Sequence, residues 1–178
     1  MSGSKVGYVL DSNTFIEAKN RYYSFELCPG FWKALIEQHK AGRVFSIDRI
    51  LSELADQGDQ LSDWVEHEVP DTFFKQTQDQ AVIGASRNMV KWVYSEGFNS
   101  GAKAEFASVA DGWVIVYVKV NGLTVVSHEK YGLGVKSRVP MPNVCREFDV
   151  PCCNTFEMMD DLGIQLILNT KRSRRKRR

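Results

Sequence analysis

The sequence predicts an α/β fold in three layers, with a central, mostly parallel sheet flanked by helices. Short runs of apolar and β-branched residues alternate along the chain with longer segments of helical spacing. Strands joined by helical crossovers lie parallel in one sheet, so this alternation indicates helices on both faces. The length of 178 residues and the 43% hydrophobic content suit one domain. We therefore assign residues 1–168 to a single domain and residues 169–178 to a disordered basic tail.

The first half of the chain begins with Val6–Leu10, which is expected to be a buried strand because it is short, apolar and ends at Asp11. The elements after it are each bounded by a proline, a glycine or an aspartate, residues typical of helix ends and turns. They are a turn at Pro29–Gly30, a helix over 31–42, a strand over Val44–Ile47, a helix over 49–58 capped by Asp48, and a helix over 60–69 begun by Asp59.

The second half contains the longest helical pattern, Thr77–Gly97. Residues 111–121 suit either a strand or a buried helix. We expect a helix, because Leu123–Ser127 is the better strand and two successive strands would break the alternation. The remaining expected elements are short helices over Ala102–Ser108, Pro142–Phe148 and residues 156–163, and an extended piece near Pro151–Thr155.

Four acidic residues stand out by their positions, and a parallel sheet brings two of them toward one edge. Asp11 follows the first strand directly, and Glu129 lies two residues past the strand ending at Ser127. The carboxyl ends of such strands form the ligand-binding edge of an open sheet. Glu53 and Asp111 sit among apolar helical residues, where an unpaired carboxylate is costly. Mg²⁺ or Mn²⁺ would be a suitable partner, since hard cations prefer oxygen ligands.

Each of these acids also has an ordinary structural interpretation. Asp11 suits an Asx-turn and Asp111 a helix N-cap. Glu53 could pair with Arg49 on the helix surface, and Glu129 could be a solvated loop charge. Taken singly these signals are weak, so the case for a metal site depends on their arrangement.

The arrangement resembles that of PIN-domain nucleases. Their acids follow the first strand, lie in an early helix, begin a later helix and follow the next strand. The matching segments here are YVLDSNTFI, ILSELADQGDQLSDW, SVADGWVIVYV and LTVVSHEKY. The chain also looks like an uncharacterised PIN-like subgroup that carries CPGFW and VPMPNVCREFDVPCCNTFEMM. A departure is the glycine after Asp111, where related sequences commonly have proline.

The resemblance implies a metal-binding and catalytic set, with supporting polar residues beside it. The implied carboxylates are Asp11, Glu53, Asp111 and Glu129, and the supporting residues are Ser12, Asn13 and Ser127. It further implies Mg²⁺- or Mn²⁺-dependent cleavage of single-stranded RNA by a metal-activated water. A toxin role, a cognate antitoxin protein as partner and a homodimer follow from the same resemblance.

The basic tail contrasts with an acidic body. Its residues Lys171, Arg172, Arg174, Arg175, Lys176, Arg177 and Arg178 are seven of the 23 basic side chains, which leaves 16 against 22 acidic ones in residues 1–170, a formal charge of −6. We expect the tail to contact RNA phosphates or an acidic partner. A solubilising terminus and a nuclear-import signal are the other interpretations.

Further side chains are assigned by context. Arg21, Tyr22 and Tyr23, in the expected loop after the first strand, border the site and are candidates for substrate contact. His128 is interpreted as a loop histidine, and the tryptophans as mainly core residues. No run spans a membrane and no signal peptide is seen, so we expect a cytoplasmic location and reduced cysteines.

Two other functions remain open at this stage. One is a catalytically inactive PIN-like module that binds RNA or a partner, although retention of all four acidic positions argues against it. The other is a phosphatase or related Mg²⁺ enzyme. The sequence after Asp11 lacks the second aspartate, two residues on, that is expected of aspartyl-phosphate enzymes, and this disfavours the phosphatase.

Overall fold

The sheet of the protein is five-stranded and entirely parallel, in a computed structural model that describes residues 6–167. Its strand order is β3-β2-β1-β4-β5. Val9 of the central strand pairs with Phe45 on one side and with Val125 on the other. The strands are β1 (Tyr8–Leu10), β2 (Val44–Ile47), β3 (Phe74–Lys75), β4 (Thr124–Val126) and β5 (Cys152–Cys153). The predicted three-layer α/β architecture with a parallel sheet is confirmed.

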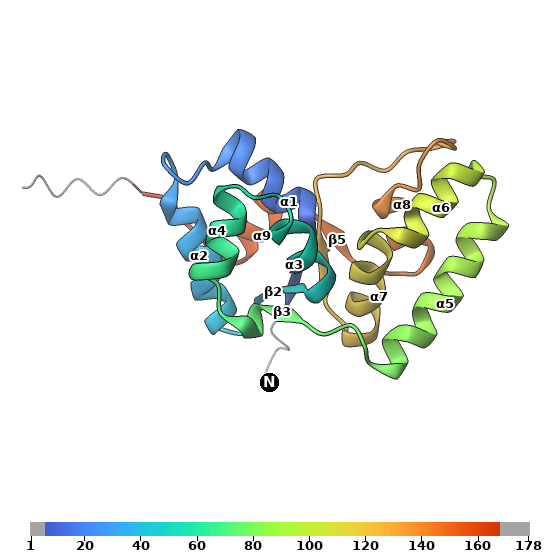
Figure 1. Cartoon of the computed structure of the whole chain (residues 1–178), viewed down its shortest axis with the longest axis horizontal. Coiled ribbons are helices and arrows are strands. Elements are labelled where there is room, and N and C mark those ends of the chain that lie inside the picture. The colour runs from blue at the N-terminus through green and yellow to red at the C-terminus, as the bar shows by residue number, and fades with distance from the viewer. Residues whose placement is uncertain (1–5, 168–178) are drawn as a thin grey trace, which may run out of the picture.

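Helices cover the sheet in two groups. Figure 1 shows α5 to α8 gathered at one end of the molecule and α1 to α4, with α9, at the other. The α-helices are α1 (Ser12–Glu17), α2 (Pro29–Lys40), α3 (Asp48–Ala55), α4 (Gln60–His67), α5 (Gln80–Ser95), α6 (Ser100–Ser108), α7 (Asp111–Asn121), α8 (Met141–Glu147) and α9 (Thr155–Asp161). A π-helix, η1 (Ala18–Tyr22), continues α1, and a 3₁₀ turn, η2 (Asp71–Phe73), precedes β3.

The central helix of the first group is α7, which contacts β1, β4 and the long helix α5. Its residues Val114, Ile115 and Val116 have no exposed surface, so it is apolar nearly all round. It ends at Gly122, whose φ of 64° is the left-handed conformation that glycine adopts without strain. The expectation that residues 111–121 form a buried helix is confirmed.

On the other side of the sheet, an aromatic cluster fills the core. The ring of Trp64 packs against Trp32 at 4.9 Å and against Phe15 at 6.1 Å between centroids. Trp32 and Trp64 are buried, as expected of core residues, while Trp92 and Trp113 are only partly buried.

Several local expectations were wrong. Arg21 and Tyr22, expected in a loop after the first strand, lie in the π-helix η1. It continues α1, which Asp11 caps and the buried Phe15 anchors in the core. Pro29–Gly30 is the first turn of α2, since proline suits that position. Asp48 is the first residue of α3, whose N-cap is Ile47. The short η2–β3 segment was not anticipated.

The four cysteines are free thiols, as expected. Within residues 6–167, no helix combines the length and apolar character that crossing a membrane requires. The basic tail, on which RNA contacts were predicted, lies outside the described residues.

Candidate metal centre

The candidate site lies where the strand order reverses. The central strand β1 has β2 on one side and β4 on the other, so the crossovers leave it in opposite directions. Such a switch point opens a crevice at the carboxyl ends of the strands. Asp11 follows β1 directly and Ser127 follows β4, so both residues stand at this crevice. The predicted convergence of the two strand ends is confirmed.

Asp11 is fully buried and its two oxygens differ in their surroundings. Its Oδ1 accepts hydrogen bonds from the backbone N–H and the hydroxyl of Thr14, which makes Asp11 the N-cap of α1. Its Oδ2 is buried and has no hydrogen-bond partner. Burial raises the pKa of Asp11 to about 6, against the lowering effect of the hydrogen bonds from Thr14 and of the nearby hydroxyl of Ser127. The capping role therefore uses one oxygen and leaves the other for a ligand.

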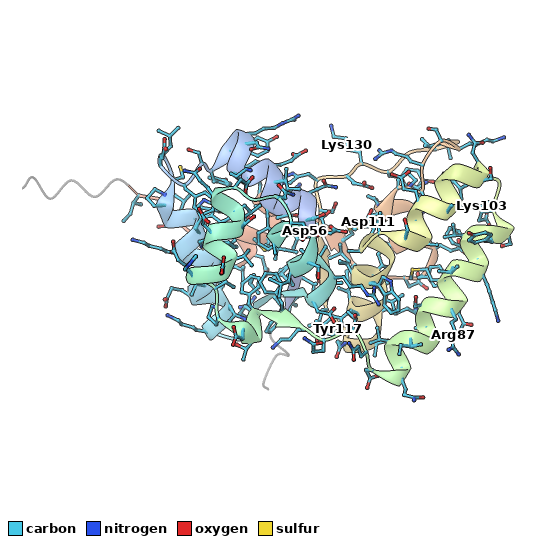
Figure 2. The ribbon with its side chains drawn as sticks, viewed as in Figure 1. Asp56, Arg87, Lys103, Asp111, Tyr117 and Lys130 are labelled. Atoms are coloured by element: carbon cyan, nitrogen blue, oxygen red, sulfur yellow. The ribbon has the colours of Figure 1, made fainter. Side chains whose placement is uncertain are left out.

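Asp111 begins α7 and faces several other acids. The pKa of its carboxyl is raised to about 7, first by burial and then by the charges of Asp11, Glu129, Glu53 and Glu105. Its side chain makes no capping bond and Ala110 is the N-cap residue, so the N-cap interpretation was wrong. Figure 2 shows Asp111 near the middle of the molecule, well away from Arg87 and Lys103 at its outer end. Burial and the surrounding acids therefore disfavour the charged form of Asp111.

Glu53 projects from α3 toward the start of α7. Its Oε1 accepts a hydrogen bond from the backbone N–H of Ala110 at 3.2 Å. It does not pair with Arg49, whose guanidinium lies 3.8 Å from the ring centre of Trp113. The alternative of a surface ion pair is therefore wrong, and Glu53 fixes the helix that carries the aspartate.

Glu129 is the acid of the four in which both carboxylate oxygens have a partner. Its Oε2 accepts the backbone N–H of Met141, the first residue of α8, at 2.7 Å, and its Oε1 lies 3.4 Å from the guanidinium of Arg138. Its own N–H donates to the hydroxyl of Ser127. These contacts hold the loop after β4 against α8, and they leave Glu129 the least open to a cation.

Five of the seven predicted residues share one hollow of about 270 Å³, whereas Asp11 and Ser127 do not line it. Its lining includes Glu53, Asp111 and Glu129, together with the supporting residues Ser12 and Asn13. Two further lining residues, Glu105 and Arg138, were not predicted from the sequence. Glu105 lies three residues after the buried Ala102 on α6, and this spacing was the available signal for its orientation.

Gly112 has a packing reason for being glycine. A Cβ at this position would lie 3.1 Å from the ring of Phe106, which is itself buried and lines the hollow. The departure from the proline of related sequences therefore accompanies a close contact between α6 and α7.

The donor set fits a cation that keeps part of its water shell. In the part of the chain that is described, no three His, Cys, Asp or Glu side chains stand together as a ready metal cage. Mg²⁺ is commonly bound through one or two carboxylates with several waters retained. The oxygens that such a cation would use here are the unpartnered Oδ2 of Asp11 and the carboxyl of Asp111.

Fold and site together define an α/β protein with a crowded acidic hollow at the switch point of a parallel sheet. Over residues 8–166 the chain matches the family described as a domain of unknown function (DUF4411), and it belongs to that family. No match is found among the curated proteins.

Proposed function

We propose that the protein is a metal-dependent ribonuclease that cleaves single-stranded RNA at the acidic hollow. One observation carries the proposal, the buried and unpartnered Oδ2 of Asp11 at the switch point, close enough to Asp111 to raise its pKa. A buried carboxylate without a partner is costly, and a divalent cation would offset that cost.

Each acid has its own part in the proposal. Asp11 and Asp111 would hold Mg²⁺ or Mn²⁺. Glu53 orients Asp111 indirectly, through its bond to the N–H of Ala110. Glu129 and Arg138 lie at the rim, where the guanidinium is available to a phosphate group of the substrate.

A bound divalent cation would supply an acidified water and would stabilise negative charge on the phosphodiester. The chain's contribution is to fix the carboxylates at the hollow, with Asp11 fully buried beside it, so that charge interactions there are stronger than in water.

The likeness of the acid positions to those of PIN-domain nucleases supports RNA as the substrate. On the same likeness we infer a toxin of a toxin–antitoxin pair, blocked by an antitoxin protein. Loss of RNA cleavage when the protein is purified in complex with such an antitoxin tests this inference.

A second candidate is a PIN-like module that binds RNA without cutting it. The contacts of Glu129 with Met141 and Arg138, and the lack of a ready three-ligand cage among the described residues, favour this candidate.

Cleavage of a mixed single-stranded RNA pool, with Mn²⁺, with Mg²⁺ and with EDTA, separates the two candidates. We expect metal-dependent cutting by the wild type, loss in Asp111→Asn, and full activity in Asp56→Asn, a matched control at an exposed position on the end of α3 (Figure 2). RNA binding without cutting under all conditions would support the binding module. Turnover of a phosphate monoester without RNA cleavage would indicate a phosphatase.

A further inference from the structure

Three rings from distant parts of the sequence meet at the surface beside the acidic hollow. Tyr22 ends η1, His128 follows β4, and Phe156 lies in α9. The ring of Tyr22 stacks on His128 at 5.6 Å with an interplanar angle of 28°, and meets Phe156 edge-on at 5.3 Å. We call these three residues the aromatic platform.

The platform is exposed in a way that a core cluster is not. Tyr22 keeps 44% of its surface open and Phe156 keeps 47%. The neighbouring Tyr23 differs, because its ring stacks on the buried Phe31 at 4.4 Å and its carbonyl accepts the indole N–H of Trp32. Of the two tyrosines expected to border the site, Tyr23 therefore serves the core and Tyr22 is available to a ligand.

The position of His128 is fixed by its contacts. Its Nε2 lies 2.8 Å from the hydroxyl of Thr155, at the start of α9, and its ring contacts both Tyr22 and Phe156, which also contact each other. The platform is thus assembled before any ligand arrives, which reduces the entropy lost on binding.

The platform is connected to the acidic hollow. His128 lines a second hollow of about 330 Å³. Asn13, Glu129 and Arg138 line both hollows, so the two adjoin. Lys130 also lines the second hollow, and in Figure 2 it lies on the loop above Asp111. A path therefore runs from Asp111, past Arg138 and Lys130, to His128 of the platform.

The aromatic platform, the cationic side chains and the acidic hollow follow one another in this order. That order matches the bases and phosphates of a single nucleic-acid strand. Bases stack on exposed aromatic rings whatever their sequence, and lysine and arginine neutralise the phosphates between them. In a duplex the base faces are already stacked on one another, so only an unpaired strand can use such rings. An apolar peptide would gain little from Lys130 and Arg138.

We propose that the aromatic platform binds a base of single-stranded RNA, with Tyr22 as the main stacking residue and the adjoining phosphate directed past Arg138 to the acidic hollow. This proposal rests on the proposed function, since it assigns the substrate strand of the same site. It makes Tyr22 and Phe156 binding residues and His128 a positioning residue.

Binding without cleavage tests the platform. Fluorescence anisotropy in EDTA would compare a short labelled single-stranded RNA with an abasic ribose-phosphate strand of equal length. We expect Tyr22→Ala to weaken RNA binding about tenfold and to leave the abasic strand unaffected. Tyr22→Phe should bind as the wild type does. Tyr94→Ala, which removes a tyrosine 53% exposed on α5, is the matched control and should change nothing.

Three outcomes would overturn the proposal. The first is wild-type RNA affinity in both Tyr22→Ala and Phe156→Ala. The second is an equal loss of affinity for the RNA and for the abasic strand in Tyr22→Ala. The third is no RNA binding by the wild type. The first would assign the rings to a protein partner. A wild type that binds RNA through Tyr22 but cuts none with any metal would refute the proposed nuclease and leave the platform standing.

Discussion

Two donors of Thr14 converge on one carboxylate oxygen of Asp11, the backbone N–H at 2.7 Å and the hydroxyl at 2.6 Å. The same hydroxyl lies 2.9 Å from the carbonyl of Val126, at the end of β4. Thr14 therefore fixes the aspartate and ties the start of α1 to the neighbouring strand. The arrangement orients Oδ2, which has no partner, toward a ligand role.

The first prediction concerns this threonine. Thr14→Val keeps the shape of the side chain but removes its hydroxyl, so Oδ1 of Asp11 and the carbonyl of Val126 each lose one of two donors. We expect the free energy of unfolding to fall by about 1–3 kcal/mol in urea denaturation. Thr14→Ser, which keeps the hydroxyl, should lose less, and equal stability of Thr14→Val and wild type would contradict the importance of this contact.

The second prediction concerns the pH dependence of stability without metal. The folded state raises the pKa of Asp11 to about 6 and that of Asp111 to about 7, from 3.8. Between about pH 4 and pH 8 these groups bind more protons in the folded than in the unfolded chain, so stability falls as pH rises. Thermal unfolding in EDTA should show a higher Tm near pH 5 than near pH 8. The opposite slope would rule out the raised pKa values as its main cause.

The third prediction assigns part of that slope to Asp111. Asp111→Asn removes a charge that the surrounding acids repel, so it should raise the Tm at pH 8 in EDTA by about 2–4 °C, or about 1 kcal/mol for a chain of this size. It should also flatten the pH dependence. Asp56→Asn, at an exposed position, provides the control and should do neither. A variant less stable than the wild type at pH 8 would mean that the carboxylate has a partner in the folded state.

The fourth prediction separates the charge of Glu53 from its hydrogen bond. Glu53→Gln retains an oxygen for the N–H of Ala110, whereas Glu53→Ala leaves the start of α7 uncapped. We expect Glu53→Ala to lose about 1 kcal/mol of stability and Glu53→Gln to lose little. Equal losses in urea denaturation would show that the charge, and not the bond, matters.

The sequence was a good guide wherever an element is long or strongly patterned. The strand at Val44–Ile47 and the buried helix over 111–121 are present as predicted. The two-residue strand Phe74–Lys75 was missed because only its pairing with β2 defines it. The helical segment after Asp11 was missed because it depends on a cap and on tertiary burial of Phe15, which local propensity does not report.

The residues of the candidate site also divide into those that could be placed from the sequence and those that depend on tertiary packing. Asp11 and Glu129 could be placed from the sequence because parallel strands bring their carboxyl ends to one edge. Glu105 could not, because its approach to Asp111 depends on how α6 packs against α7. The hydrogen bond between Glu129 and Met141 was equally hidden, since the eleven loop residues 130–140 lie between the two in the chain.

Titration of the metal-free protein with Mn²⁺, with free Mn²⁺ followed by electron paramagnetic resonance, tests the central claim most directly. We predict a saturable site in the wild type and in Asp56→Asn. In Asp11→Asn and Asp111→Asn the affinity should fall by about tenfold or more, because each removes one charged oxygen ligand. Equal Mn²⁺ affinity in all four proteins would contradict a cation site formed by Asp11 and Asp111.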